Sequence, residues 1–300
     1  LARALCHADN CYYLPNARLA GYPCKTNTVS NTAFRGFGGP QGMIVIEAML
    51  EHIARELGMP LDDVRAVNYY GTDERNVTPY QQTVKDNIIV PLVERLQAEV
   101  DFDGMSKAVD DFNASHETLK KGLALMPVKF GISFNTPKLN QAGALVHVYA
   151  DGSVHLNHGG TEMGQGLFTK VAQVVASVFQ IDLDNIKISA TRTDKVPNTS
   201  ATAASSGSDL NGMAAFNAAN TIKDRMTGVA AEIFDTDADQ VEFRQNRVYA
   251  GNESLSFSEL AEQTYNRRVQ LSAAGFYSTP GLHWDAKSLI GNPFYYFTYG

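Results

Sequence analysis

The sequence has no continuous apolar run of the roughly 18 residues that a membrane-spanning helix needs, so it predicts no transmembrane segment. It also has no block of lysine and arginine, and its 32 acidic residues outnumber its 25 basic ones. With a formal net charge of −7, a broad nucleic-acid-binding surface is not expected, because too little positive charge is available to neutralise a run of phosphates. Neither a membrane nor a nucleic acid is therefore a predicted partner.

Cysteine is scarce as well. The three cysteines, Cys6, Cys11 and Cys24, are unevenly spaced and fit neither a disulfide framework nor a zinc-binding pattern. Such usage is typical of a reducing compartment and predicts a cytoplasmic protein. The chain begins without methionine and ends in the aromatic, strand-like stretch "NPFYYFTYG", so we expect it to be a piece of a larger protein.

The composition is otherwise that of a globular protein, with 44% hydrophobic and 19% charged residues in 300. The hydrophobic spacing changes near residue 128 from mainly helical to strand-like, which predicts a mixed α/β fold. Helices are expected at 40–57, 61–68, 84–100, 103–124, 165–179, 208–231 and 256–266. Strands are expected at 128–134, 143–158, 185–192 and 241–249, with Ala150–Ser153 as a hairpin turn.

The first segment with chemical character is Asn31–Met43, "NTAFRGFGGPQGM". Its glycines and proline are typical of a turn that leads into a helix. They are equally compatible with a loop whose backbone approaches a ligand, where Arg35 would donate hydrogen bonds and Phe37 would offer a ring face. The segment alone leaves both readings open.

The second segment is His158–Gly166, "HGGTEMGQG", which follows a predicted strand and opens a predicted helix. Its glycines predict bare backbone N–H groups at a helix N-terminus, where an anionic ligand is favoured. It matches neither the P-loop nor the dinucleotide-binding fingerprint. His158 is either a ligand or base or simply hydrogen-bonded, and Glu162 is either a general base or part of the helix cap.

The third segment is Thr199–Asp209, "TSATAASSGSD". Small and hydroxylated residues that lead into a helix can wrap a phosphate, but they can also form a helix-packing surface or a flexible loop. Taken together, three such loops, each before a helix, predict a large anionic cofactor that is held mainly by backbone groups.

These segments, together with "RALCHADNCYYLPN" and "GISF…LNQAGALVHVYADGS", resemble in the same order the molybdenum-cofactor-binding part of the xanthine dehydrogenase and aldehyde oxidase family. The resemblance covers the whole chain and implies parts of two molybdopterin-binding domains. It implies that residues 1–101 end the first domain, that residues 102–127 form a helical connector, and that residues 128–300 begin the second domain.

The resemblance also implies roles for individual residues. Molybdopterin would be bound by Arg35, Gly164, Gln165, Thr202, Ala203, Ala204, Ser205, Ser206 and Ser208. Gln165 falls near the molybdenum without being assigned as a ligand. A purine would be bound by Arg3, Phe37, Phe134 and Asn135, with Phe37 stacking on it and Arg3 facing its far oxygen. Asn135 stands where the family pattern has threonine.

The function implied for the complete enzyme is oxidative hydroxylation of hypoxanthine and xanthine to urate. The family's general-base glutamate lies beyond Gly300, and no iron–sulfur or FAD segment is present, so this fragment alone is expected to be inactive. FAD and iron–sulfur clusters are expected on other domains or subunits of an oligomeric complex. The alternatives are an aldehyde oxidase-type molybdenum hydroxylase and a non-catalytic scaffold fragment.

Overall fold

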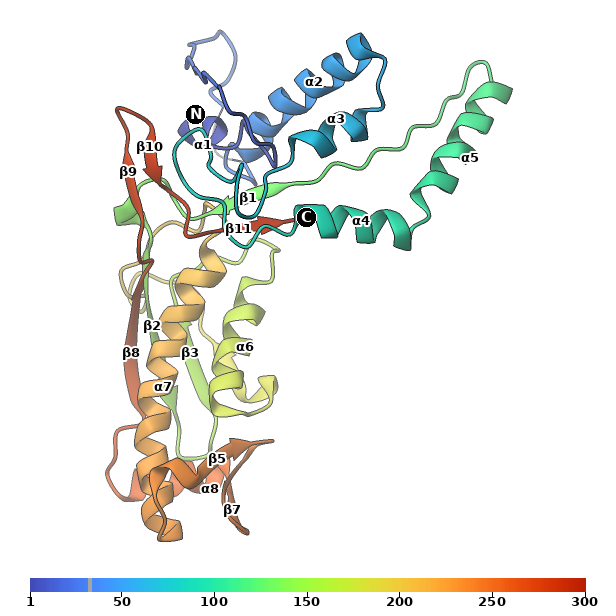
Figure 1. The fold of residues 1–300 in the computed structure, drawn as a ribbon. Helices are drawn as coiled ribbons and strands as arrows, with labels where there is room; N and C mark the ends of the chain where they lie inside the picture. Colours follow the sequence, from blue (N-terminus) through green and yellow to red (C-terminus); the bar gives the residue numbers. More distant parts are fainter. Residues whose placement is uncertain (32–33) are drawn as a thin grey trace. The chain divides into compact units, whose positions relative to one another are not determined.

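The computed structural model describes residues 1–31 and 34–300, and it divides into two compact units (Figure 1). The first unit contains residues 1–135 and 281–300, and the second contains residues 136–280. The boundaries at residues 101 and 127 that the family resemblance implies stay a prediction. Among the described residues, no helix is long and apolar enough to cross a membrane.

The first unit contains five helices and two small antiparallel sheets among its described residues. The helices are α1 (Ala2–Leu5), α2 (Gly39–Leu57), α3 (Leu61–Asn68), α4 (Ile89–Glu99) and α5 (Phe102–Ser115). Strand β1 (Lys129–Ile132) pairs with β11 (Tyr296–Tyr299), and β9 (His283–Asp285) pairs with β10 (Ile290–Asn292). The unit is therefore closed by the last residues of the chain.

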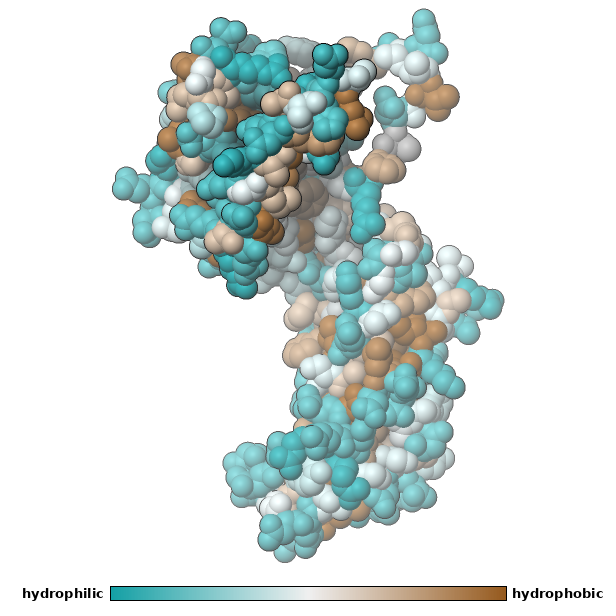
Figure 2. Space-filling model, turned by 90° about the vertical axis from the view of Figure 1, so that its right-hand side faces the viewer, coloured by the Kyte–Doolittle hydropathy of each residue, from teal (hydrophilic) through white to brown (hydrophobic). Residues whose placement is uncertain are grey.

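Helix α2 follows the predicted helical spacing. Its apolar residues Met43, Ile46 and Leu50 are buried, and the helix ends at Gly58, whose φ of 63° is left-handed. Ile44 on the same helix remains 70% exposed, and Figure 2 shows hydrophobic residues at the surface of both units. The predictions of α2 and α3 are confirmed.

The predicted bounds of the next two helices were wrong. Helix α4 begins at Ile89 rather than near residue 84, because the N–H of Val84 donates to the carbonyl of Asn76 and the side chain of Asn87 accepts from the N–H of Ile89. Helix α5 ends at Ser115 rather than near residue 124. There the Asn113 side chain bonds the backbone of Lys121, which turns the chain back outside the helix.

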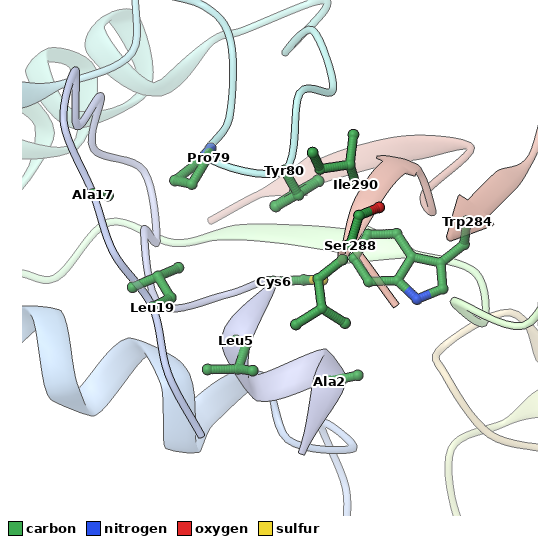
Figure 3. Close-up of a pocket in the computed structure, with 11 residues that line it drawn as sticks. Ala2, Leu5, Cys6, Ala17, Leu19, Pro79, Tyr80, Trp284, Ser288 and Ile290 are labelled. Carbon is green, nitrogen blue, oxygen red and sulfur yellow. The ribbon is translucent and has the colours of Figure 1, made fainter. Parts of the chain in front are cut away.

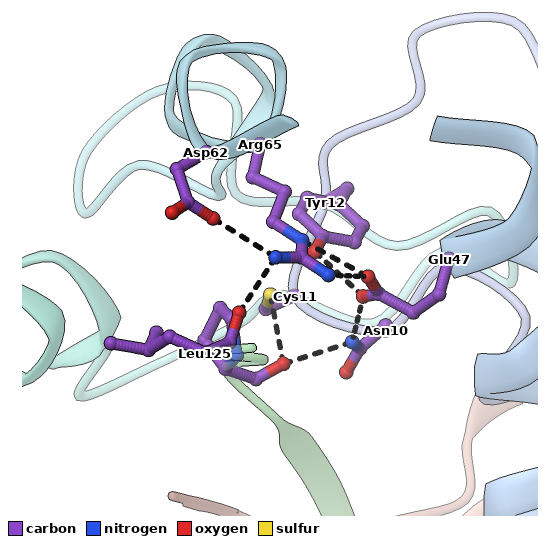
Figure 4. A network of polar contacts seen from close by, with 8 residues as sticks. Asn10, Cys11, Tyr12, Glu47, Asp62, Arg65 and Leu125 are labelled. Atoms are coloured by element: carbon purple, nitrogen blue, oxygen red, sulfur yellow. Dashed lines mark hydrogen bonds and ion pairs between the residues drawn. The ribbon is translucent and has the colours of Figure 1, made fainter. Parts of the chain in front are cut away.

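A buried polar network joins α2, α3 and the strand-like segment before β1 (Figure 4). Arg65 donates to one Glu47 oxygen through Nε and Nη2, at 3.1 and 2.8 Å, and to the carbonyl of Leu125 at 2.6 Å. The other Glu47 oxygen accepts from the Tyr12 hydroxyl at 2.6 Å and from Asn10 at 2.9 Å. Two donors of the guanidinium thus meet a single, charged carboxylate oxygen, and the network fixes α2 against the chain that leads into β1.

The second unit is built on a four-stranded sheet in the order β4–β3–β2–β8. Its strands are β2 (Gln141–Val148), β3 (Val154–His158), β4 (Ile186–Ile188) and β8 (Ser272–Ser278). Helices α6 (Leu167–Phe179) and α7 (Gly207–Phe234) pack on the sheet. A second sheet holds β5 (Val241–Arg244), β6 (Arg247–Ala250) and β7 (Glu253–Ser256), followed by α8 (Phe257–Asn266). Three short 3-10 turns are η1 (Pro137–Leu139), η2 (Leu183–Asn185) and η3 (Ala238–Gln240).

Small residues allow α7 to lie close to the sheet. Ala214 and Ala218 are fully buried, and a Cβ added at Gly275 of β8 would collide with the carbonyl oxygen of Ala214 and come within 2.6 Å of the Ala218 nitrogen. The predicted hairpin turn between β2 and β3 and the predicted Ser256 cap of α8 are confirmed. The mixed α/β fold class is also confirmed.

Candidate functional site

The glycine-rich turn before α2 has an unusual backbone. Gly36, Phe37 and Gly38 have φ values of 94°, 51° and 103°, so three successive residues are left-handed. A Cβ at Gly38 would lie 3.2 Å from the backbone nitrogen of Ala4, so glycine allows the turn to approach α1. A phenylalanine held in this conformation costs free energy, and such residues cluster at functional sites. Thr32 and Ala33 of the predicted motif lie outside the described residues.

This turn brings two of the predicted substrate-binding rings together. Phe37 and Phe134 lie edge to face, with their centroids 5.9 Å apart and their planes at 78°. Phe134 is buried, Phe37 and Asn135 are half-buried, and Arg35 is exposed. The perpendicular pair gives the first unit an aromatic corner beside the turn.

Arg3 contacts the backbone that directly precedes Phe134. Its Nη1 and Nη2 donate to the carbonyls of Ser133 and Gly131, both at 2.5 Å, and only 3% of the residue is exposed. Burial lowers the pKa of Arg3 to about 10, so the guanidinium remains charged at neutral pH. Arg3 therefore anchors the backbone that leads to the aromatic corner.

His7 supports the same backbone, and this role was not predicted from the sequence. Its Nδ1 donates to the carbonyl of Arg3 at 2.8 Å, and its Nε2 accepts from the N–H of Gly131 at 3.0 Å. Burial lowers the pKa of His7 to about 3, so the ring is neutral. Its position four residues after Arg3, on the same side of a helical turn, is the signal that was available.

A buried ion pair underlies the same region and was also missed. Lys129 of β1 lies 3.3 Å from Asp9, and each side chain is 1% exposed. The Tyr70 hydroxyl donates to the same Asp9 oxygen at 2.6 Å, and the Lys129 ammonium lies 4.4 Å from the Phe297 ring centroid. These contacts join the start of the chain to both strands of the β1–β11 pair.

A pocket of about 210 Å³ lies beside α1 (Figure 3). Leu5, Leu19 and Trp284 contribute to its wall, together with the Cys6 thiol, whose pKa burial raises to about 12. None of the residues predicted to bind cofactor or substrate lines it. A thiol this difficult to ionise is a poor nucleophile.

In the second unit, the expectation of bare amides in the His158–Gly166 loop was wrong. The Glu162 carboxylate accepts from the N–H groups of Gly164, Gly166 and Phe168 at 2.9, 3.0 and 3.0 Å. The N–H of Gly160 donates to Nδ1 of His158 at 3.1 Å. Glu162 is thus the cap of α6, one of its two predicted roles, and its carboxylate already occupies the position that a bound anion would take.

Gln165 is held within the same loop. Its side-chain oxygen accepts from the N–H of Met163 at 2.5 Å, and its amide nitrogen donates to the carbonyl of Thr161 at 2.8 Å. The N–H of Thr161 donates to the Thr202 hydroxyl at 2.9 Å. This last bond joins His158–Gly166, the glycine-rich loop, to Thr199–Asp209, the small-residue loop. The structure therefore brings these two predicted cofactor segments together.

The small-residue loop presents a different helix start. Ala204 and Ser205 are both left-handed, with φ values of 56° and 58°, and Ala204 and Ser206 are each 2% exposed. The Ser206 hydroxyl donates to the carbonyl of Ala203, and Ser205 and Ser208 are exposed. The side chain of Ser206, the N-cap residue of α7, makes no cap hydrogen bond. Small and hydroxylated residues thus lead into the start of α7, where an anionic group is favoured.

The fold is also found in parts of two solved oxidoreductases. The structure superposes on the aldehyde oxidoreductase from Desulfovibrio desulfuricans with a TM-score of 0.77, at 21% identity, over 99% of this chain and 30% of that one. It superposes on a Cu,Mo-containing CO dehydrogenase with a TM-score of 0.71, at 20% identity, over 88% of this chain and 34% of that one.

The molybdopterin cofactor-binding domain family matches residues 1–69 and 95–300, and the chain belongs to that family. It is 47% identical over its whole length to xanthine dehydrogenase of Oryza sativa, and 44% identical to that of Blastobotrys adeninivorans. It is also 44% identical over 98% of its length to nicotinate hydroxylase of Emericella nidulans. The chain spans about a fifth of the length of these relatives. The predicted family and cofactor class are confirmed.

The residues of the second unit fit such a cofactor. A Cβ at Gly164 or Gly166 would meet no atom within 4 Å, so space is open beside that loop. The residues around the start of α7 are small, and the side chains of Ser205 and Ser208 there are exposed. A phosphate-bearing pterin needs backbone donors with little side-chain bulk around them.

Proposed function

We propose that the chain is the molybdopterin-binding portion of a xanthine dehydrogenase-type enzyme that hydroxylates hypoxanthine and xanthine to urate. The observation that carries the proposal is the Phe37–Phe134 pair, because two perpendicular rings can hold a flat heteroaromatic substrate by stacking on its face and packing on its edge. The identity of 44–47% to xanthine dehydrogenases over the whole chain supports the same substrate class.

In this proposal the predicted residues have two tasks, cofactor binding and substrate binding. Molybdopterin is bound by Arg35, Gly164, Gln165, Thr202, Ala203, Ala204, Ser205, Ser206 and Ser208, with Gln165 nearest the molybdenum. When bound, the cofactor supplies the redox-active metal centre for substrate hydroxylation. Phe37, Phe134 and Asn135 orient the substrate, and Arg3 stabilises the negative charge that grows on it.

Asn135 favours a second candidate, hydroxylation of a pyridine carboxylate such as nicotinate. It stands where the family pattern has threonine, and a relative at 44% identity is a nicotinate hydroxylase. An amide can donate two hydrogen bonds to a carboxylate, whereas a hydroxyl donates one. Aldehyde oxidation is less well supported, since a small aldehyde has no group that needs the Arg3 cation.

The complete enzyme requires parts that this chain does not carry. We assign the general base to a glutamate beyond Gly300, and electron transfer to FAD and iron–sulfur clusters on other domains or subunits of an oligomeric complex. A cytoplasmic location agrees with the free cysteines Cys6, Cys11 and Cys24.

The test is to purify the complete protein, measure its molybdenum and pterin content, and compare the oxidation of xanthine, nicotinate and an aromatic aldehyde. We expect about one molybdopterin per protein chain and the highest kcat/KM with xanthine. A preference for nicotinate would select the second candidate. Absence of both metal and pterin would favour the alternative of a non-catalytic scaffold.

Arg35→Lys in the complete protein is expected to lower the molybdenum content or the rate of turnover. Arg35 is exposed, and a guanidinium can donate two parallel hydrogen bonds, whereas lysine is a single-point donor. Metal analysis and steady-state kinetics on the same preparation measure both effects. If content and rate both stay at wild-type values, Arg35 is only part of a turn.

A further inference from the structure

The loop from Thr161 to Phe168 is organised around one exposed carboxylate. Glu162 accepts from three N–H groups within six residues of itself, those of Gly164, Gly166 and Phe168. These bonds, that of Phe168 foremost, lower the pKa of Glu162 below its ordinary value, so the side chain is ionised at neutral pH. Gly164 and Gly166 are left-handed, with φ values of 90° and 73°. The carboxylate therefore selects one backbone conformation from the many that two glycines allow.

The side chain of Gln165 depends on this conformation. Both of its hydrogen-bond partners, the N–H of Met163 and the carbonyl of Thr161, belong to the backbone that Glu162 holds. Thr161 also donates to the hydroxyl of Thr202 in the small-residue loop. A change in the Glu162 bonds would thus reach Gln165 directly and Thr202 through one further hydrogen bond.

We propose that Glu162 is a positioning residue of the cofactor site: its carboxylate holds the Gly164–Phe168 backbone and Gln165 in register with the Thr202 loop. This inference rests on the proposed molybdopterin site and adds a residue to it. Glu162 itself does not contact the substrate.

The experiment compares Glu162→Ala with Glu259→Ala in the complete protein. Glu259 is a matched control, because it is also an exposed carboxylate that caps a helix of the second unit, through the N–H and the hydroxyl of Ser256. After extensive dialysis, we expect Glu162→Ala to retain roughly tenfold less molybdopterin than wild type, since groups that orient a metal site change its affinity about 10–100-fold. Glu259→Ala should retain the wild-type amount, although both variants lose a cap.

Two further measurements separate positioning from simple destabilisation. Excess formate should restore cofactor retention in Glu162→Ala, because a small carboxylate can occupy the vacated position, and it should not change Glu259→Ala. Hydrogen exchange should become faster at 161–168 in Glu162→Ala without formate. If Glu162→Ala fails to fold, Glu162→Gln serves instead, since its amide oxygen still accepts while its NH2 group opposes one N–H.

The outcomes distinguish a failure of the proposed function from a failure of the proposed role of Glu162. Wild-type protein that contains no molybdopterin would overturn the proposed function. Wild-type protein that contains it, together with a Glu162→Ala variant that retains it equally well, would overturn only the role of Glu162. Equal losses in Glu162→Ala and Glu259→Ala would show a general effect of cap removal and would also overturn it.

Discussion

Replacing Lys129 with methionine is expected to lower the free energy of unfolding by about 3–5 kcal/mol, because it leaves the Asp9 carboxylate buried without its cation. The aliphatic part of the side chain is largely kept, so the effect reports the charge rather than a cavity. Chemical denaturation of the variant and of wild type at neutral pH measures it.

The sign of the pH dependence follows from Asp9. Burial, the largest influence, raises the pKa of Asp9, and removal of the Lys129 ammonium raises it further. A carboxyl whose pKa is higher in the folded state than in the unfolded state regains stability as the pH falls. The loss in Lys129→Met should therefore shrink as the pH is lowered toward about 4, the unfolded value for aspartate.

Two variants control this prediction. Asp9→Asn combined with Lys129→Met removes both charges and should recover much of the loss. Arg95→Met breaks the exposed pair of Arg95 with Glu99 and should cost no more than about 0.5 kcal/mol. A Lys129→Met variant as stable as Arg95→Met would mean that the buried pair contributes little.

Arg3→Met in the complete enzyme is expected to slow xanthine oxidation about a hundredfold, the effect of losing one well-placed donor to developing charge. Oxidation of an aromatic aldehyde should be much less affected. An interaction that strengthens in the transition state lowers kcat, whereas one that is equal in both states raises KM, so full kinetics with both substrates are required.

The structure adds a second effect to this variant. Methionine would leave the carbonyls of Gly131 and Ser133 without the guanidinium, and buried acceptors left unpaired cost about 1–3 kcal/mol each. Kinetics must therefore be measured well below the unfolding temperature of the variant. Equal losses with purine and aldehyde would limit Arg3 to its observed role as a backbone anchor.

The parts of the fold that were predicted correctly are those with local causes. Helix α2 has a buried apolar stripe and a glycine stop, and α8 has Ser256 and Glu259 as a capping box. The bounds of α4 and α5 were wrong because single asparagine side chains bond the backbone outside the helix, and hydrophobic spacing carries no sign of such bonds. The prediction of unbonded amides in the glycine-rich loop was wrong for a similar reason. The flexible side chain of Glu162 folds back and accepts hydrogen bonds from its own loop.

In the candidate site, the residues that were predicted are those in the motifs that resemble the family. The Phe37 and Phe134 rings were assigned by resemblance, and the structure adds their perpendicular contact. The supporting ion pair could not be predicted, because Asp9 and Lys129 are 120 residues apart and no spacing in the sequence links them. Arg3 likewise reaches residues 128 and 130 positions away. Such contacts depend on the tertiary fold, which no local periodicity encodes.

The pairing of β1 with β11 has a consequence for biosynthesis. Lys129 is registered with Tyr299, so the first unit lacks one strand of its own sheet until the last residues of this chain have been synthesised. Residues 136–280 form a continuous insertion and can fold as a unit while they emerge, since domains fold in order during translation. The first unit, which carries Phe37 and Phe134, would then complete its folding after the second unit, although most of its sequence is synthesised first.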